Sequence, residues 1–270
     1  MWTKSGKPAY SSAMIGFLLK KTFFDIWDNL FRIALVNIGF LLSAAIPVLV
    51  PSLLSSVPVL AIGIMVVGAL WCFVYLTAAA IALRTISDYG AFGFADFFRA
   101  VREGWPAGLA LGFAVVILSF FAYAALPFYL GMQSMLGIFA AALVFWTLVV
   151  CLLAIQYYPA VRARLSGDPR KIIKKCFILF FDNPGLSVFA ILHNLVLLVA
   201  SFFLAFLVPG PAGILLFLDE ALRLRLLKYD WIEANPDANR KKIPWDLLLM
   251  EEEEKTGTRS LRNFIFPWKD

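Results

Sequence analysis

Residues 33–83 read IALVNIGFLLSAAIPVLVPSLLSSVPVLAIGIMVVGALWCFVYLTAAAIAL and contain no Asp, Glu, Lys or Arg. Two more long uncharged runs follow, from Ala107 to Val161 and from Leu186 to Leu218. A helix of about 20 apolar residues crosses a bilayer, so each run is long enough for at least one crossing. Hydrophobic residues make up 61% of the 270 residues, against roughly 45–50% in soluble domains. The sequence therefore predicts an all-α, polytopic integral membrane protein.

Turn-forming residues interrupt each apolar run near its middle. The first break is the serine-rich stretch from Pro51 to Pro58, the second is Gly131 to Met135, and the third is Pro209 to Pro211. Proline cannot continue the helical hydrogen-bond ladder, and serine and glycine favour turns. We therefore expect three helical hairpins, near residues 31–84, 106–161 and 186–227.

The basic residues predict the orientation of these hairpins. All 24 Lys and Arg lie outside the apolar runs, in residues 4–32, 84–102, 162–175 and 223–269. Positively charged segments of membrane proteins stay on the cytoplasmic side. This distribution explains the net charge of +6 by contact with a lipid bilayer rather than with nucleic acid. We expect a multi-pass protein of the bacterial inner membrane with both termini in the cytoplasm.

Residues 212–227 are the uncertain crossing, because they contain two acidic and two basic side chains. Hydropathy alone favours an amphipathic surface helix here and five crossings in total. Five crossings would place the basic tail outside, whereas six keep every basic residue inside and leave the outer loops uncharged. We therefore expect six crossings, with a membrane domain over residues 1–228 and a cytoplasmic tail over residues 229–270.

An internal repeat accompanies the hairpins. Each hairpin follows an aromatic segment, namely residues 23–30, 98–105 and 177–184, and ends in a basic cluster. The segments have aromatic and charged faces, which is typical of amphipathic helices at the membrane surface. Three repeated units of interfacial helix plus hairpin are thus predicted. The aromatic residues expected to anchor them are Phe23, Phe24, Trp27, Phe97, Phe98, Trp105, Phe177 and Phe181.

The residues needed for most catalytic and metal centres are missing from the sequence. It has one histidine, His193, and three cysteines that are widely separated. Two-histidine metal motifs, Walker motifs and dinucleotide-binding motifs are absent. We expect a protein that is not an enzyme and that uses no metal or cofactor.

Three polar features lie within the apolar runs or at their edge. They are Asn37, the pair His193 and Asn194, and the pair Asp219 and Glu220, with Arg223 one turn further on. Ionisable groups within a membrane are costly and are therefore candidates for function. One hypothesis is a proton-linked or cation-linked site near the midplane. The other is that Glu220 pairs with Arg223, while His193 and Asn194 hold neighbouring helices together.

The tail contains two apolar segments that are candidates for binding. Trp245 begins the run WDLLLM, which follows Pro244 and precedes four glutamates, as expected for a short docking helix. Near the end of the chain, Phe264, Phe266 and Trp268 are too apolar to stay fully solvated. We expect Trp245 to make a contact through the docking helix, and the three terminal aromatic residues to lie on lipid, on the protein's own surface or on a partner.

The aromatic and basic segments 23–32 and 94–105, each leading into a membrane helix, resemble the YesL-like family of bacterial membrane proteins. The resemblance covers about residues 20–228. It implies an accessory role, since such proteins are often associated with carbohydrate uptake through ABC-type transporters. We therefore expect a non-enzymatic accessory or assembly partner of membrane transport subunits. The alternatives are a small secondary transporter or channel that uses the midplane polar residues, and a lipid-handling protein.

Overall fold

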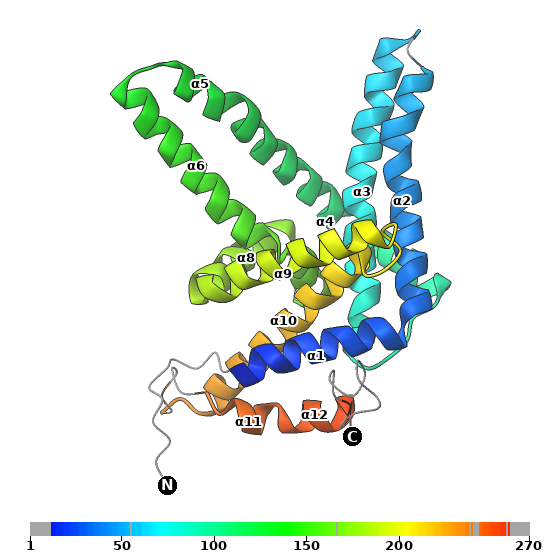
Figure 1. Ribbon diagram of the computed structural model, residues 1–270, viewed down its shortest axis with the longest axis vertical. Coiled ribbons are helices and arrows are strands. Elements are labelled where there is room, and N and C mark those ends of the chain that lie inside the picture. The colour runs from blue at the N-terminus through cyan, green and yellow to red at the C-terminus, as the bar shows by residue number, and fades with distance from the viewer. Residues whose placement is uncertain are drawn as a thin grey trace. The chain divides into compact units, whose positions relative to one another are not determined.

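The computed structural model describes residues 12–54, 56–165, 167–237, 239, 243–257 and 259, and over these residues the chain is helical, without β-strands. Its elements (Figure 1) are α1 (Ser12–Asp28), α2 (Leu30–Leu53), α3 (Pro58–Ser87), α4 (Phe94–Phe120), the π-helical turn η1 (Phe121–Ala125), α5 (Leu126–Gly131), α6 (Met135–Ile155), α7 (Tyr158–Arg164), α8 (Pro169–Asp182), α9 (Pro184–Phe203), α10 (Gly210–Ala234), α11 (Trp245–Leu248) and α12 (Met250–Thr256). The described residues form two compact units, one from 31–219 and one from 1–30 with 220–270.

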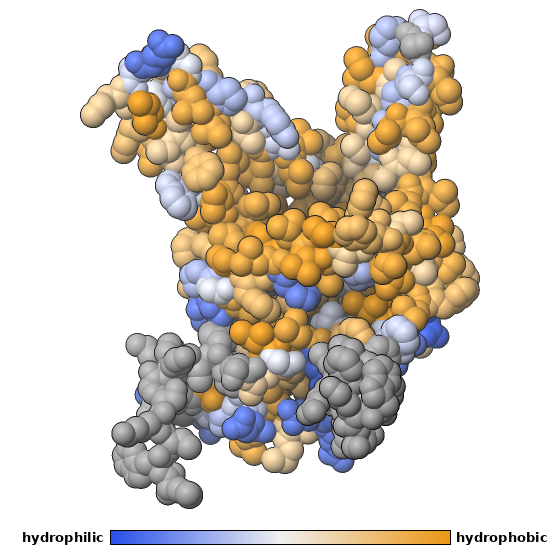
Figure 2. All heavy atoms as spheres, in the orientation of Figure 1, coloured by the Kyte–Doolittle hydropathy of each residue, from blue (hydrophilic) through white to orange (hydrophobic). Residues whose placement is uncertain are grey.

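Long apolar helices dominate the unit of residues 31–219. Five stretches are long and apolar enough to cross a membrane, namely Leu30–Leu53, Pro58–Ser87, Phe94–Gly131, Met135–Arg164 and Pro184–Phe203. Apolar residues cover most of the visible surface of the α2–α3 and α5–α6 hairpins (Figure 2). This confirms the prediction of a multi-pass α-helical membrane protein.

The segment predicted as a sixth crossing lies within α10, which is not among these five stretches. Its charged residues, beginning with Asp219 and Glu220, lower its hydropathy below that of the other long helices. The helix continues without a break to Ala234. The predicted boundary between residues 228 and 229 therefore falls inside a helix.

The first hairpin has the predicted form, because α2 ends at Leu53 and Pro58 occupies the first turn of α3. The two helices approach closely where Gly68 faces Pro47, since a Cβ on Gly68 would lie 3.0 Å from the proline ring. Deeper in the hairpin, the Tyr75 hydroxyl donates a hydrogen bond to the Val36 carbonyl at 2.8 Å. The hairpin is thus closed by small-residue packing and by a tyrosine that crosses it.

A stripe of small residues joins α3 to α4. Gly104, Gly108 and Gly112 recur every four residues on α4 and are all buried. A Cβ added at Gly108 would lie 2.5 Å from the Cα of Val74, so the two backbones are nearly in contact there. Small residues at this spacing let membrane helices approach until backbone packs on backbone. This contact binds the first and second hairpins together.

The expected separate surface helix before the second hairpin is not present. Residues 94–105 form the first part of α4, which continues through Pro106 to Phe120. The glycine stripe packs on α3 on both sides of Pro106, with Gly104 against Ile81 and Gly108 against Val74. This packing keeps the helix continuous, although proline removes one hydrogen bond from the ladder. By contrast, α1 and α8 are separate helices that precede α2 and α9.

The other unit is built from α1, the later part of α10, α11 and α12. Both α11 and α12 contact α1, and Trp245 and Leu249 are buried. The guanidinium of Arg259 lies 4.5 Å from the centre of the Phe24 ring and pairs with Asp28. Within the tail, the run that begins at Trp245 forms two short helices, α11 and α12, which contact α1. Phe264, Phe266 and Trp268 lie outside the described residues.

Candidate intramembrane polar site

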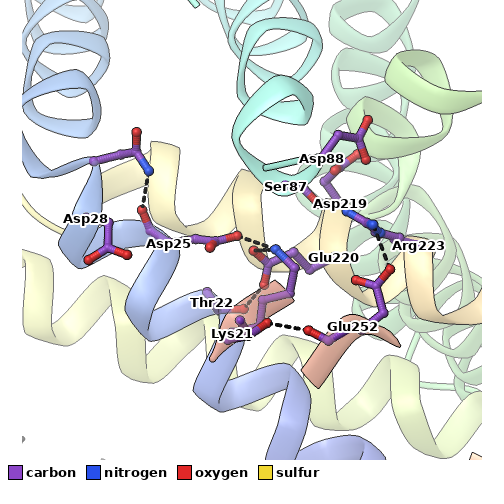
Figure 3. Close-up of polar contacts among 12 residues, drawn as sticks. Lys21, Thr22, Asp25, Asp28, Ser87, Asp88, Asp219, Glu220, Arg223 and Glu252 are labelled. Carbon is purple, nitrogen blue, oxygen red and sulfur yellow. Dashed lines mark hydrogen bonds and ion pairs between the residues drawn. The ribbon is translucent and has the colours of Figure 1, made fainter. Parts of the chain in front are cut away.

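Arg164, the last residue of α7, is the centre of the largest polar network in the described part of residues 31–219. Its Nε donates to Asp219 Oδ1 at 2.9 Å, and its Nη2 donates to Asp219 Oδ2 at 2.5 Å. Its remaining donors reach Asp88 Oδ1 at 3.0 Å and Ser87 Oγ at 2.9 Å. The side chain of Arg164 is 8% exposed and that of Asp219 is fully buried. Figure 3 shows Asp219 beside Ser87 and Asp88.

This network joins the ends of two helices to the middle of a third, and the three helices are far apart in the sequence. Ser87 and Asp88 end α3, Arg164 ends α7, and Asp219 lies in the middle of α10. A guanidinium that binds a carboxylate through two parallel hydrogen bonds fixes both distance and orientation. Because Arg164 binds side chains on α10 and at the end of α3, this network ties the three helices together.

Two neighbouring arginines act in a similar way at the ends of the helices. Arg84 Nη1 donates to the Ala163 carbonyl at 2.7 Å, and Arg162 Nη2 donates to the Glu103 carbonyl at 2.8 Å. Ala163 is in the last turn of α7, where carbonyl groups lack a partner within the helix and attract positive charge. The basic clusters that predicted the topology therefore also connect the hairpins.

Asn37 forms a second tie, between α2 and the segment that connects α9 to α10. Its Nδ2 donates to the carbonyls of Leu207 and Pro209 at 2.8 and 2.9 Å, and its Oδ1 accepts from the Ala212 amide at 2.9 Å. Asn37 is fully buried. Gly210 has a φ of +57°, and a Cβ there would lie 2.3 Å from Asn37 Nδ2. The turn thus requires glycine both for its backbone conformation and for space.

His193 and Asn194, which were predicted to share a polar cluster with Asp219, have other surroundings. The ring of His193 stacks on Phe217, with centroids 4.0 Å apart, and also on Phe189. His193 Nδ1 and Asn194 Oδ1 are buried without a hydrogen-bond partner among the described residues. The structure therefore does not bring the imidazole to the carboxylate of Asp219, which is bound to Arg164.

Glu220 and Arg223 belong to the other unit and have different partners. Glu220 accepts a hydrogen bond from the Thr22 hydroxyl, and its Oε1 lies 3.6 Å from Lys21 Nζ (Figure 3). Arg223 Nη2 donates to Glu252 Oε1 at 2.7 Å. The predicted pair of Glu220 with Arg223 is therefore replaced by two contacts, one to α1 and one to α12. The five predicted residues lie in separate groups rather than in one site.

The predicted aromatic anchors fall into two groups by exposure. Trp27, Phe98, Trp105 and Phe181 are 48%, 71%, 52% and 67% exposed, as a membrane anchor requires. Phe24 is buried, whereas Phe23, Phe97 and Phe177 are partly buried. Phe97 packs on Tyr75 with ring centroids 5.2 Å apart. Half of the predicted anchors thus contribute to internal packing instead of extending fully from the surface.

Sequence reasoning missed Arg164 and the glycine stripe. In the sequence Arg164 is one member of a basic cluster, and nothing indicates which carboxylate it meets 55 residues later. The stripe had a readable signal, since Gly104, Gly108 and Gly112 follow the small-xxx-small pattern of membrane helix contacts. Among the described residues, no three His, Cys, Asp or Glu side chains are grouped as a metal site would require.

Comparison with protein-family models, with curated proteins and with solved structures finds no match to this chain. Its class rests on the long apolar helices, which define a multi-pass α-helical membrane protein in contact with a lipid bilayer. The resemblance to the YesL-like family stays a prediction.

Proposed function

We propose that this chain is a non-enzymatic protein of the bacterial inner membrane that acts as an accessory or assembly partner of a transport complex. The observation that carries the proposal is that buried polar side chains of the helices bind other parts of the protein. Asp219 and Asn37 are both fully buried, and both bind groups on other parts of the helical unit. A transporter needs comparable groups to face its solute. Carbohydrate uptake through an ABC-type system is the setting that the YesL-like resemblance implies.

The cavity within the second hairpin also supports a role other than solute passage. It has a volume of about 370 Å³ and lies among α4, η1 and α6. Its lining residues are Ile117, Leu118, Phe121, Leu143, Val144, Thr147, Leu148 and Cys151. The Thr147 hydroxyl already donates to the Leu143 carbonyl at 2.8 Å. The lining of the cavity is therefore almost entirely apolar. It has no unused strong hydrogen-bond donor that a polar solute could bind.

The tail helices provide the surface for a partner. Leu247 and Met250 are 63% and 62% exposed, although both belong to a polar cytoplasmic segment. They adjoin the acidic residues Glu251, Glu253 and Glu254, which are also exposed. Exposed apolar side chains beside a mainly acidic patch, in which Lys255 pairs with Glu251, are typical of an interaction site. We propose that a cytoplasmic surface of the transport complex, basic and partly apolar, binds here.

Site-specific photocrosslinking in intact cells tests this proposal. A benzophenone amino acid at Leu247 or Met250 is expected to yield one discrete adduct with a subunit of a membrane transport complex. The same amino acid at Asp230, which is exposed on α10, is the matched control and should yield none. Adducts equal at all three positions, or adducts only with lipid, would reject an assembly role for this surface.

A secondary transporter remains the second candidate, because of one specific observation. His193 Nδ1 and Asn194 Oδ1 are buried in α9 without hydrogen-bond partners among the described residues. A bound cation or a polar solute could satisfy such atoms. Liposomes that contain only this protein should show no proton or sugar flux under the leading proposal. Flux that is lost in His193→Leu with unchanged folding would establish the transporter instead.

We further propose that α9 and α10 form a hairpin that enters the membrane from the cytoplasm and turns at about the depth of Asn37. Asn37 is seven residues along α2 from Leu30, which corresponds to about 10 Å at 1.5 Å per residue. The turn bound to Asn37 would then lie within the inner half of the bilayer. Phe202 and Phe203, which are 70% and 79% exposed at this turn, suit hydrocarbon better than water.

This hairpin resolves the conflict between five and six crossings. Irregular backbone is tolerated inside a membrane only where its polar groups are satisfied. Asn37 satisfies the carbonyls of the turn, and the Ser201 hydroxyl accepts from the Gly210 amide at 2.8 Å. A hairpin that returns to the cytoplasm keeps the basic tail on the cytoplasmic side, as six crossings would. It does not require α10, which contains Asp219, to span the whole membrane. Both termini are then cytoplasmic.

A further inference from the structure

A cleft of about 300 Å³ lies where α3 ends and α4 begins. Its lining residues are Ile81, Ala82, Thr85, Ala91, Asp96, Arg99, Ala100 and Glu103. Apolar side chains of α3 and α4 form part of the wall, and one guanidinium and two carboxylates supply its charge. A cleft with one apolar part and a small number of polar groups is typical of a small-ligand site.

The polar groups of the cleft are only partly used by the protein. Asp96 Oδ2 accepts from the Gly93 amide at 3.0 Å, which caps α4, and its Oδ1 lies 3.5 Å from Arg99 Nη1. Arg99 is 69% exposed, so most of its five N–H donors remain open. Glu103 is exposed and its carboxylate makes no ion pair among the described residues. One cation and one anion are therefore available together.

Aromatic residues on α4 fix the depth of this cleft in the membrane. Phe98 and Trp105 are 71% and 52% exposed on the same turns of helix that carry Arg99 and Glu103. Tryptophan and other aromatic residues gather at the headgroup level of a bilayer. The charged part of the cleft thus lies where lipid headgroups lie, on the side that bears the basic loop residues.

We propose that this cleft binds the headgroup of an aminophospholipid, with Arg99 on the phosphate and Glu103 on the primary ammonium. The two side chains are four residues apart on one helix, which separates their Cβ atoms by about 5–6 Å. A headgroup in which two carbons join the phosphate to the amine carries its two charges at a similar spacing. Asp96 and Glu103 are negative and Arg99 is positive, so the cleft has a net negative charge. It therefore disfavours a headgroup that carries only negative charge. The proposal is independent of the transport partner.

Native mass spectrometry of the purified full chain tests the proposal with three defined lipids. Dioleoyl-phosphatidylethanolamine is expected to be retained about threefold better than the choline lipid, as befits one exposed ion pair. The choline headgroup keeps the positive charge but has no N–H to donate. Glu103→Gln should abolish this preference, and Arg99→Gln should weaken retention of both lipids. Glu233→Gln, an exposed change on α10, should alter neither.

Each of the following results would overturn the proposal. The first is equal retention of the ethanolamine and choline lipids by the unchanged protein. The second is a preference that survives Glu103→Gln, or tighter retention of dioleoyl-phosphatidylglycerol than of the ethanolamine lipid. The third is displacement of the lipid by an equal concentration of O-phosphoethanolamine, which would make a soluble phosphoester the ligand. Thermal unfolding of each variant, expected to be unchanged, separates these results from misfolding.

Discussion

Arg164 shows why a buried charge can persist in a protein that lives in lipid. A buried ion loses its hydration, and only well-oriented partners compensate for that loss. Arg164 has such partners on two other helices, through its contacts to Asp88, Ser87 and Asp219. The same arrangement makes each partner dependent on the others, since removal of the arginine leaves a fully buried carboxylate without its counter-ion.

We predict that Arg164→Leu destabilises the protein by about 3–5 kcal/mol, the usual cost of breaking a buried ion pair from one side. The double variant Arg164→Leu with Asp219→Leu should recover a large part of this loss, because no uncompensated charge remains. Denaturant unfolding in mild detergent measures both effects. Glu251→Gln, which removes an exposed pair with Lys255, is the control and should have little effect. Additive losses in the double variant would show that the two residues do not interact.

Cys176 provides a prediction on reactivity. It is buried in α8, and desolvation raises the pKa of its thiol from 9.0 to about 12. Only the thiolate reacts with maleimides, and at pH 8 a thiol with such a high pKa is almost entirely protonated. We expect Cys176 to be labelled far more slowly than a cysteine placed at exposed Lys174 in a Cys176→Ser background. If the folded protein were labelled at Cys176 as fast as at the introduced cysteine, Cys176 would be accessible.

At the scale of elements, the close packing of α3 on α4 depends on glycines, which have no side chain, at the contact. The backbones meet at Gly108, and neighbouring contacts are made by Gly104 with Ile81 and by Gly112 with Leu70. Within a membrane the hydrophobic effect does not drive helices together, so close packing must supply the stability. The contact is therefore sensitive to the addition of a single methyl group.

We predict that Gly108→Ala destabilises the protein by about 1–3 kcal/mol, the range for overpacking a tight contact. A new Cβ there would lie 2.5 Å from the Cα of Val74, and backbone cannot move aside cheaply. Gly63→Ala on α3 is the matched control, because a Cβ at that position meets nothing within 4 Å. Unfolding midpoints of the two variants give the comparison. Equal midpoints would mean that α3 and α4 are not held by this stripe.

The element boundaries also show how far the sequence could be interpreted. Pro58 correctly marked the start of α3, because an exposed turn and a first-turn proline are local signals. The second hairpin was expected to begin near residue 106, but its first helix begins at Phe94, because the packing of Gly104 and Gly108 on α3 keeps the helix continuous there. The charged partners were not predictable at all. Asp219 lies next to Glu220 in sequence, yet the two carboxylates bind Arg164 and Thr22, which are far from each other along the chain.

For the whole molecule, the depth of the α9–α10 turn decides the topology. We predict that cysteines at Ser56 and Gln133, in a cysteine-free background, react with an impermeant maleimide added outside cells, because both lie in uncharged loops. A cysteine at Asn235 should react only after the cells are opened. A cysteine at Phe203 should resist the impermeant reagent on both sides, as expected for a turn within hydrocarbon.

Two outcomes of this labelling would contradict the proposed topology. Reaction at Phe203 from outside would show that α9 and α10 both cross the whole membrane. Reaction at Asn235 from outside would place the tail on the other side and would require an odd number of crossings.

We expect the two units to respond differently when the chain is shortened at its C-terminal end. Deletion of residues 244–270 removes the buried Trp245 and the Glu252 partner of Arg223. The unit of residues 31–219 should stay folded, while α1 loosens and exposes Lys21, which is 2% exposed in the full chain. Limited trypsin digestion should then cleave at Lys20 or Lys21. Deletion of residues 260–270 alone is the control and should leave both lysines protected.

The tie made by Asn37 has a consequence for the order in which the protein is made. Asn37 leaves the ribosome well before its acceptors at Leu207 and Pro209, which are about 170 residues further along the chain. Until those residues have been translated, the asparagine amide has to find a temporary partner, such as water, lipid headgroups or the insertion machinery. We therefore expect the turn between α9 and α10 to dock on α2 late in membrane assembly, so a nascent chain stalled before residue 207 should lack this contact.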